Sequence, residues 1–256
     1  MFLYQCEDTL ESIFTAIYRV YEEHRDKDEV MLVLDKEPRL FAIEIPVVAD
    51  RERSEKVARS LCGKFGIEDY ERICLALAST DAEKAQAVYR TVVSGLNLQG
   101  RSSYGRLFEN LGDAEVCKAF KLSRNAGREC CHLEGFLRFE ELEGKVLYAQ
   151  VEPENNLLTF LMAHFSNRFP EENFLIHDVG RRQMGIHKKQ EGLDTWFTVD
   201  VSEMRERPQL RHSMDEGCYQ ELFRCFCKEI GIQERENAQL QRNLLPLHFR
   251  KYMTEF

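Results

Sequence analysis

The 256-residue sequence has no apolar run that approaches the roughly 18 residues typical of a membrane-spanning helix. Its first twelve residues, MFLYQCEDTLES, lack the basic start and long apolar core of a secretory signal. The nine cysteines are odd in number and irregularly spaced, which is not the pattern of a disulfide-stapled fold. We therefore expect a soluble protein of the reducing cytoplasm that has no membrane partner.

The sequence also lacks an excess of basic residues. It has 44 Asp and Glu against 35 Lys and Arg, and its formal net charge is -9. A protein that coats nucleic acid over its whole surface needs a cationic face, so the composition excludes this class. A local basic groove is an alternative if the fold brings together basic residues at positions 124, 128, 181, 182, 188, 189, 242, 250 and 251. An ordinary solvated surface of mixed charge is the alternative for each of them.

No spacing in the chain matches a metal site, a phosphate-binding loop or a catalytic nucleophile. Cys130, Cys131 and His132 are adjacent in a stretch predicted to be helical, which would splay their side chains apart. Cys225 and Cys227 would face different sides of a helix, so they make a poor chelate. We expect no metal and no cofactor.

Helical periodicity dominates the first hundred residues. The strongest pattern predicts a helix after Asp8, whose spacing to Glu11 is that of a capping box. More helices are expected from residue 50 to residue 96, with Gly66 as a stop signal. Short strands are expected over residues 2–5, 30–34 and 40–45.

Residues 99–105, QGRSSYG, have the composition of a linker. We therefore expect a mainly helical portion over residues 1–100 and an α+β portion over residues 101–256, either as two domains or as one continuous domain.

In the second portion Asp113 is expected to cap a helix that runs towards His132. After Gly135 the apolar period changes to two, which predicts a hairpin over residues 136–151. A helix over residues 157–169 and strands over 174–177, 183–187 and 196–201 follow. Gly180 is expected to supply a positive φ in the turn between two of these strands.

A last helix follows Met214, and Cys218 and Cys225 are interpreted as its core residues. The fold class is therefore α+β: a helix-rich N-terminal portion followed by a small, mainly antiparallel sheet covered by helices.

Candidate site residues gather between positions 125 and 187, which hold four of the seven histidines. His132, His177 and Asp178 are the catalytic candidates, because an imidazole that titrates near neutrality can act as a general acid or base. A structural hydrogen bond at a turn is the alternative for His177. Guanidinium groups make bidentate contacts with phosphate. The candidates for binding nucleic acid or phosphate are Arg128, Arg138, His164, Arg168, Arg181 and Arg182.

The C-terminal tail is the candidate surface for a protein partner. Its apolar residues are Leu244, Leu245, Leu247 and Phe249. Contiguous exposed apolar residues mark interfaces, so these would bind a partner if they are exposed. The alternative is that the tail packs on its own core.

Several segments resemble an uncharacterised family linked to DNA metabolism and repair. The matching segments are HLEGFLRFEEL, EPENNLLTFLMAHFSNRFP, FLIHDVGRR, YQELFRCFCKEI and LQRNLLPLHFRKYMTE. The resemblance covers the chain nearly from end to end. It implies a domain that is fused to a uracil-DNA glycosylase in some relatives and encoded beside a radical-SAM protein in others. This chain has no C-x-x-x-C-x-x-C run, so a partner would supply the radical chemistry.

Three functions follow from the residues and the resemblance. The first is an accessory protein of DNA metabolism or repair that binds nucleic acid or a nucleotide and acts with a radical-SAM or glycosylase partner. The second is an enzyme that acts on a nucleobase or phosphoester by His/Asp acid–base chemistry. The third is a pure interaction adaptor.

Overall fold

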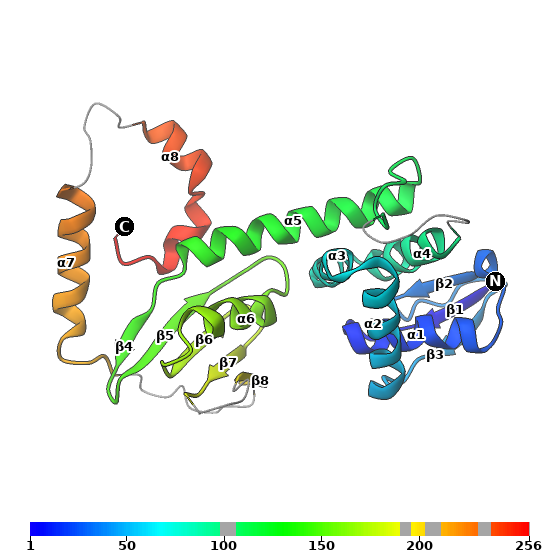
Figure 1. The fold of residues 1–256 in the computed structure, drawn as a ribbon, viewed down its shortest axis with the longest axis horizontal. Helices are drawn as coiled ribbons and strands as arrows, with labels where there is room; N and C mark the ends of the chain where they lie inside the picture. Colours follow the sequence, from blue (N-terminus) through cyan, green and yellow to red (C-terminus); the bar gives the residue numbers. More distant parts are fainter. Residues whose placement is uncertain (98–105, 190–195, 203–210, 230–236, 256) are drawn as a thin grey trace. The chain divides into compact units, whose positions relative to one another are not determined.

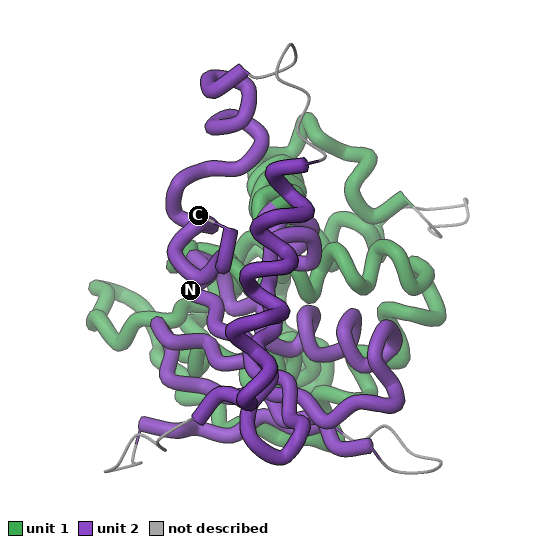
Figure 2. Tube along the Cα trace, turned by 90° about the vertical axis from the view of Figure 1, so that its left-hand side faces the viewer, with its two compact units in different colours: residues 1–128 green, residues 129–256 purple. Residues whose placement is uncertain are grey.

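A computed structural model describes residues 1–97, 106–189, 196–202, 211–229 and 237–255 (Figure 1). By its backbone contacts the chain divides into two compact units, Met1–Arg128 and Glu129–Phe256, which are coloured separately in Figure 2. The predicted linker at residues 99–105 and the expected boundary at residue 100 lie outside the described residues. No helix of the described segments is long and apolar enough to cross a membrane.

Unit 1 contains a small parallel sheet and most of the helices predicted for it. Its elements up to residue 97 are β1 (Phe2–Gln5), α1 (Leu10–Glu22), η1 (Lys27–Glu29), β2 (Val30–Val33), β3 (Ile43–Pro46), α2 (Arg51–Phe65), α3 (Ile67–Ala78) and α4 (Lys84–Leu96). The strand order is β2-β1-β3, and β1 pairs in parallel with both neighbours. Because parallel neighbours need a crossover connection, α1 joins β1 to β2.

The start of α1 differs from its prediction. The hydroxyl of Thr9, not the carboxylate of Asp8, caps the helix by accepting a hydrogen bond from the Ser12 amide at 3.1 Å. Asp8 instead makes an ion pair with the buried Lys84 ammonium at 2.5 Å. The predicted stop at Gly66 is confirmed, since this residue ends α2 with a φ of 92°.

A single apolar core holds unit 1 together. Helices α1, α2, α3 and α4 contribute their apolar faces to it, and Tyr4 of the central strand lies within it. The rings of Phe14 and Phe65 are fully buried there. The helical periodicity in the sequence therefore identified the buried faces correctly.

Helix α5 (Ala114–Phe136) continues through the boundary at residue 128. Its start is confirmed, because the Asp113 carboxylate accepts hydrogen bonds from the Glu115 and Val116 amides at 2.9 and 3.3 Å. The helix ends at Phe136, and residues 137–139 are irregular. The strand that was expected to begin at residue 136 therefore begins at Glu140.

Unit 2 contains a five-stranded sheet and three further helices of its own. After α5 its described elements are β4 (Glu140–Leu142), β5 (Val146–Val151), α6 (Leu158–Arg168), β6 (Phe174–Asp178), β7 (Gln183–His187), β8 (Trp196–Asp200), α7 (Glu216–Glu229), α8 (Ala238–Leu244) and η3 (Leu247–Tyr252). The strand order follows the sequence, β4-β5-β6-β7-β8. Only the β5–β6 pair is parallel, and α6 is its crossover. The α+β class and the mainly antiparallel sheet are confirmed.

Aromatic side chains form much of the packing between α6 and the sheet. The ring of Phe139 lies 5.2 Å from Phe165, 5.8 Å from Phe169 and 5.7 Å from Phe174, measured between centroids. All three contacts are edge-to-face, the arrangement that the charge distribution of aromatic rings favours. This packing fixes α6 and therefore the loop that precedes it.

Two interpretations of the second portion are wrong. The positive φ in the β6–β7 turn belongs to Arg182, at 54°, and not to Gly180. Cys218 and Cys225 are exposed on α7 and not in the core, since Glu216 is the only buried residue of that helix. Hydrophobic spacing shows that a helix is amphipathic, but not that its apolar face is covered.

Candidate functional site

The candidate site lies in unit 2, where the parallel strands β5 and β6 end. Val151 and Asp178 are paired in register as the last residues of these strands. Two segments continue from them: the EPEN loop, residues 152–155, and the β6–β7 turn, residues 179–182. Polar groups that follow parallel strands meet at one edge of the sheet, which is where ligands bind in α/β structures.

Glu129 of α5 holds the EPEN loop in place. Its carboxylate accepts hydrogen bonds from the Glu154 amide at 2.6 Å, the Asn155 amide at 3.0 Å and the Asn155 side-chain nitrogen at 2.6 Å. Such charge-assisted bonds are about twice as strong as neutral ones. These bonds attach the loop to the helix, and the buried Pro153 anchors it further.

Asp178 and Arg181 attach the β6–β7 turn to the same loop. The Asp178 side chain is fully buried and accepts from the Arg181 amide at 3.0 Å and from its guanidinium at 3.2 Å. The guanidinium also donates to the carbonyls of Pro153 at 2.9 Å and Glu154 at 2.5 Å. These bonds occupy much of the donor capacity of Arg181, so its role here is to hold the two loops together.

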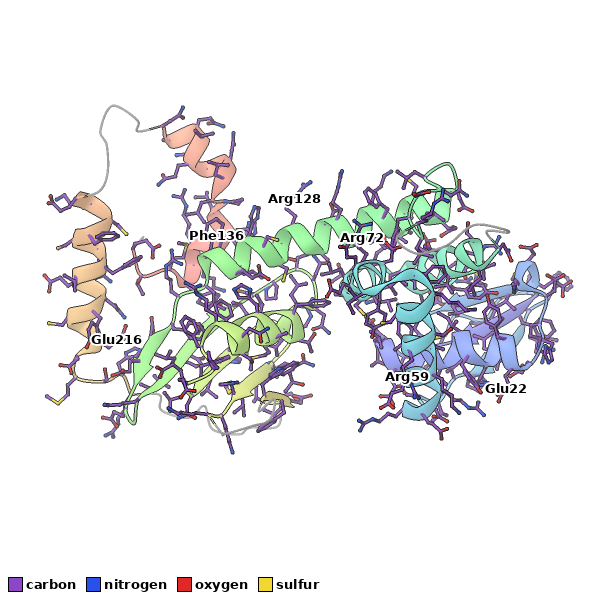
Figure 3. The ribbon with its side chains drawn as sticks, in the orientation of Figure 1. Glu22, Arg59, Arg72, Arg128, Phe136 and Glu216 are labelled. Carbon is purple, nitrogen blue, oxygen red and sulfur yellow. The ribbon has the colours of Figure 1, made fainter. Side chains whose placement is uncertain are left out.

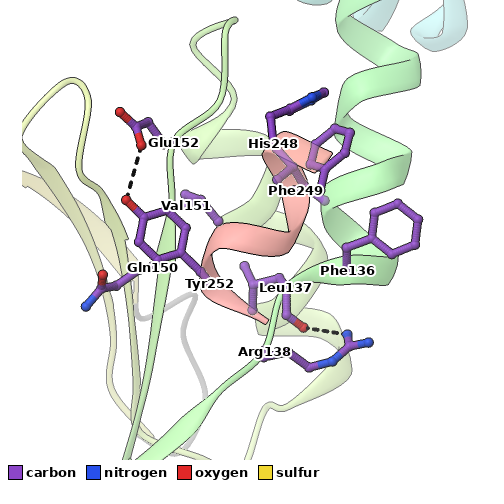
Figure 4. A pocket seen from close by; sticks show the side chains of 10 residues that line it. Phe136, Leu137, Arg138, Gln150, Val151, Glu152, His248, Phe249 and Tyr252 are labelled. Carbon is purple, nitrogen blue, oxygen red and sulfur yellow. Dashed lines mark hydrogen bonds between the residues drawn. The ribbon is translucent and has the colours of Figure 1, made fainter. Parts of the chain in front are cut away.

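A small pocket lies beside the EPEN loop, between β5, the end of α5 and η3 (Figure 4). Its volume is about 20 Å³, which is enough for a single water molecule and far too small for a nucleobase. The Glu152 carboxylate at its edge accepts hydrogen bonds from Lys251 and from the Tyr252 hydroxyl. The bond from the Lys251 ammonium, followed by that from Tyr252, lowers the pKa of Glu152.

Four rings gather next to this pocket and are called the ring cluster: His132, Phe136, His248 and Phe249. His132 stacks on Phe136 at 5.7 Å and meets Phe249 edge-on at 5.4 Å. His248 lies 4.0 Å from Phe249. His248 is exposed and the other three are half-buried. The labelled Phe136 side chain can be followed at the end of α5 in Figure 3.

The Arg138 side chain is bonded to other residues of unit 2. Its guanidinium binds the Glu255 carboxylate through two nitrogens, at 2.6 and 3.1 Å, and donates to the Gly135 carbonyl at 3.0 Å. It also lies 5.5 Å from the ring of Phe223. These bonds occupy most of the five N–H donors of the guanidinium, so Arg138 has little capacity left for a phosphate.

The predicted histidines have separate partners. The His177 ring nitrogen Nδ1 lies 2.9 Å from the Tyr148 hydroxyl, and His164 Nδ1 lies 3.7 Å from a Glu134 carboxylate oxygen. His132 belongs to the ring cluster. Asp178, the third catalytic candidate, is bonded to Arg181 and not to a histidine in the contacts above. None of these contacts joins a histidine to Asp178. A catalytic His/Asp pair therefore stays a prediction.

Three of the predicted arginines have exposed side chains. They are Arg128 on α5, labelled in Figure 3, Arg168 on α6 and Arg182 in the β6–β7 turn. The guanidinium of Arg168 lies 5.6 Å from the Phe169 ring. Exposed guanidinium groups of this kind can reach a phosphate without losing a buried partner.

The four predicted partner-binding residues fall into two classes. Leu244 is 63% exposed and Leu247 is 65% exposed, so both are free to meet another protein. Leu245 and Phe249 are half-buried, and Phe249 packs in the ring cluster. The tail therefore packs partly on its own unit, and partner binding through its exposed leucines stays a prediction.

Sequence reasoning missed Glu129, Glu152 and Tyr252. Each is an ordinary polar residue by sequence, and its partner is 25 to 100 positions away along the chain. The only available signal was the EPENN segment, which lies directly after a predicted strand. Within the described residues, no group of three or more His, Cys, Asp or Glu side chains is arranged to hold a metal ion.

No curated protein matches the chain. One family model matches it over residues 82–255, from the start of α4 through η3. The match includes both loops of the candidate site and the ring cluster. Because it covers well over half of the 256 residues, the chain belongs to the DUF4130 family, described as a domain of unknown function.

Proposed function

We propose that this protein is an accessory factor of DNA metabolism or repair that binds single-stranded nucleic acid and presents it to a partner enzyme. The partner class implied by the resemblance of its motifs is a radical-SAM protein or a glycosylase. The chain itself would supply binding and positioning.

The ring cluster is the observation that supports the proposal most. His248 is exposed, and the half-buried Phe136 and Phe249 lie beside it. Every base has a π-face, so aromatic side chains bind single strands with little sequence preference, each stacked base contributing about 1–3 kcal/mol. The pocket of about 20 Å³ is too small to enclose a base, which favours stacking on the surface over insertion.

Phosphate contacts would come from exposed cations of unit 2. Arg168 and Arg182 are exposed, and Lys251 lies next to the ring cluster in sequence, where it pairs with Glu152. The chain as a whole is acidic, so only a local contact of a few phosphates is expected. The salt dependence of binding should be correspondingly modest.

Fluorescence anisotropy with a labelled single-stranded oligonucleotide tests this proposal directly. Phe249→Leu keeps an apolar side chain but removes the ring, and His248→Ala removes an exposed ring. Each should weaken binding by roughly fivefold to a hundredfold, the equivalent of one lost stacked base. Arg168→Gln with Arg182→Gln should reduce the slope of log K against log salt by about 1 to 2.

Phe41→Leu is the matched control, because Phe41 is 97% exposed and lies outside the candidate site, in the connection between β2 and β3 of unit 1. It should bind as the wild type does. If neither single-stranded nor duplex DNA showed salt-dependent binding, with or without the radical-SAM partner, the proposal would be wrong.

An adaptor function is the second candidate, and the exposure of Leu244 and Leu247 favours it. A partner bound through protein contacts alone should co-purify after nuclease treatment. Leu244→Glu with Leu247→Glu should then abolish co-purification, whereas Phe249→Leu should not. Loss of the partner on nuclease treatment would instead favour a nucleic-acid bridge.

A further inference from the structure

Unit 1 contains a cavity between the helices α1, α2 and α4, which are labelled in Figure 1. Its volume is about 230 Å³, far more than that of the pocket beside the EPEN loop. Its buried lining is aliphatic and consists of Ile17 of α1, Val57 and Leu61 of α2, and Val92 of α4. Packed protein interiors leave few gaps larger than a water molecule, so a hollow of this size is a candidate ligand site.

The polar lining of the cavity comes from one edge of α2. Lys56, Ser60 and Lys64 recur every four residues, so they lie along the same edge of the helix. All three are exposed, whereas the aliphatic lining is buried. None of the described residues that line the cavity is acidic. The cavity therefore has an apolar interior and a rim, called the lysine rim, that carries two positive charges.

The Lys56 ammonium lies beside an aromatic ring of the cavity wall. It is 5.8 Å from the centre of the Tyr18 ring, which also lines the cavity. Its carboxylate partner is Glu52, at 2.7 Å, which is exposed and does not line the cavity. A solvent-exposed ion pair of this kind contributes little free energy, so an anion at the lysine rim can compete with Glu52 for the ammonium.

Tyr21 brings an unsatisfied polar group to the same cavity wall. Its side chain lines the cavity, and its buried hydroxyl has no hydrogen-bond partner among the described residues. Buried polar groups are nearly always hydrogen-bonded, so an exception requires an explanation, and a bound acceptor is one. Turning this hydroxyl towards a ligand would break no existing hydrogen bond.

We propose that the cavity binds a small monoanionic amphiphile, a medium-chain carboxylate whose apolar chain fills the interior and whose carboxylate is held at the lysine rim. A sugar or a nucleobase would lose its hydrogen bonds to water against the aliphatic lining, and a cationic ligand would meet two ammonium groups. An engineered cavity of roughly 150 Å³ holds benzene, so about 230 Å³ suits a ligand of about ten non-hydrogen atoms. Octanoate has this size and charge.

Titration of the full, isotope-labelled chain with octanoate, followed by NMR, tests the proposal. Chemical-shift changes should cluster on α1, α2 and α4 and saturate with a dissociation constant of about 0.1–1 mM, as expected for so small a ligand. Octylamine has the same chain with the opposite charge. It should bind in this cavity about tenfold more weakly or not at all, because its ammonium meets the lysine rim.

Two sets of substitutions separate the charge of the rim from the volume of the cavity. Lys56→Gln with Lys64→Gln should weaken octanoate binding about fivefold to twentyfold and remove its advantage over octylamine. Leu96→Trp places a larger ring in the cavity from a half-buried position on α4, and it should abolish the binding of both ligands.

Arg51→Gln with Arg59→Gln is the matched control. It removes the same charge from two exposed positions of α2 that do not line the cavity, of which Arg59 is labelled in Figure 3. It should bind octanoate as the wild type does, and circular dichroism of every variant checks that the fold is retained.

Four outcomes would overturn the proposal. They are the absence of saturable shift changes up to about 10 mM octanoate, shift changes that lie outside the three helices, octylamine bound as tightly as octanoate, and a lysine variant that binds like the arginine control.

Discussion

Unit 1 and unit 2 differ in what holds their loops. In unit 1 the buried residues are mostly apolar and cluster around β1, and the loops are joined to them by backbone bonds, caps, ion pairs and a single buried carboxylate described there, that of Asp69, which accepts from the Leu107 amide at 3.0 Å. In unit 2 the loops at the ends of β5 and β6 are held by Glu129, Asp178 and Arg181. An apolar core gives stability, whereas a polar network fixes the position of particular groups.

This difference in loop attachment is one reason to place the candidate site in unit 2. A loop held by charge-assisted bonds can present side chains at a defined place while remaining open to solvent. Unit 2 also carries the ring cluster and the exposed faces of α7 and α8. Unit 1 contains a cavity of about 230 Å³ between α1, α2 and α4, so the placement of the candidate site in unit 2 rests on its loops and the ring cluster and not on cavity size. Substitutions should separate the contributions of the two units.

The largest effect is expected in the core of unit 1. Phe14→Ala removes a fully buried ring and should cost about 3–5 kcal/mol of unfolding free energy. Hydrogen exchange followed peptide by peptide should show faster exchange in β1 and α1. Exchange in β5 and β6 should be unchanged if the two units unfold separately. An equal increase in exchange in unit 1 and unit 2 would show that the chain unfolds as one cooperative unit.

A comparable loss is expected from the polar network of unit 2. Asp178→Asn leaves the Arg181 guanidinium without its buried anion and should cost about 2–4 kcal/mol in chemical denaturation. Asp200→Asn is the control, since Asp200 is an exposed carboxylate that accepts a bond from the Ser202 amide at the end of β8. It should change stability by less than about 0.5 kcal/mol. Equal effects of the two substitutions would contradict a special role for the network.

The packing of α6 on the sheet gives a smaller effect. A Cβ at Gly185 in β7 would overlap the Met162 side chain of α6, so Gly185→Ala should destabilise unit 2 by about 1–3 kcal/mol. Gly63→Ala, at an exposed position in the last turn of α2 where nothing lies within 4 Å, should instead stabilise unit 1 by up to about 1 kcal/mol. Thermal unfolding measures both. A Gly185→Ala variant as stable as the wild type would show that the Met162 contact does not decide its effect, and a destabilising Gly63→Ala would show that helix propensity does not decide the other.

The smallest effect concerns a buried hydroxyl in unit 1. Among the described residues the Tyr21 hydroxyl has no hydrogen-bond partner, so Tyr21→Phe should stabilise by about 1 kcal/mol or less at pH 7. Tyr4→Phe is the contrast, because the Tyr4 hydroxyl donates to Glu23 at 2.8 Å, and it should destabilise.

Tyr21 also makes unit 1 sensitive to alkali. Burial raises the pKa of Tyr21 to about 12, whereas a free tyrosine titrates near 10. The unfolded chain loses this proton first as the pH rises, so stability present below pH 10 is lost between about pH 10 and pH 12. Tyr21→Phe should make this loss shallower in pH-dependent denaturation. An unchanged profile would show that other tyrosines of unit 1 dominate it.

Local patterns in the sequence predicted many of the elements. The apolar spacing of α1, α2 and α6 identified these helices because each buries one face at the helical period. The turn after residue 178 identified β6 and β7 as two paired strands. The Asp113 cap and the Gly66 stop were also correct. The predictions of a cap at Asp8 and of a positive φ at Gly180 were wrong. Thr9 takes the first role and Arg182 the second, each within two residues of the predicted position.

The sequence predicted which stretch of the chain carries the candidate site, but not how its side chains are arranged. Its candidate residues are close together in the sequence, and the structure assigns those between 128 and 182 to several places, among them the β6–β7 turn, the ring cluster and exposed positions on helices. Glu129 and Glu152, which organise the loops, gave no sequence signal because an isolated glutamate on a helix or after a strand is common.

By itself, the sequence determined the class of fold, the apolar faces of most helices and the turns at which the strands end, since these depend on residues close together in the chain. Only the tertiary structure decided that Glu129 binds the EPEN loop, that Arg138 is paired with Glu255, and that the apolar face of α7 is uncovered. Those outcomes depend on contacts between residues far apart in sequence. Periodicity carries no information about which partner each side chain will meet.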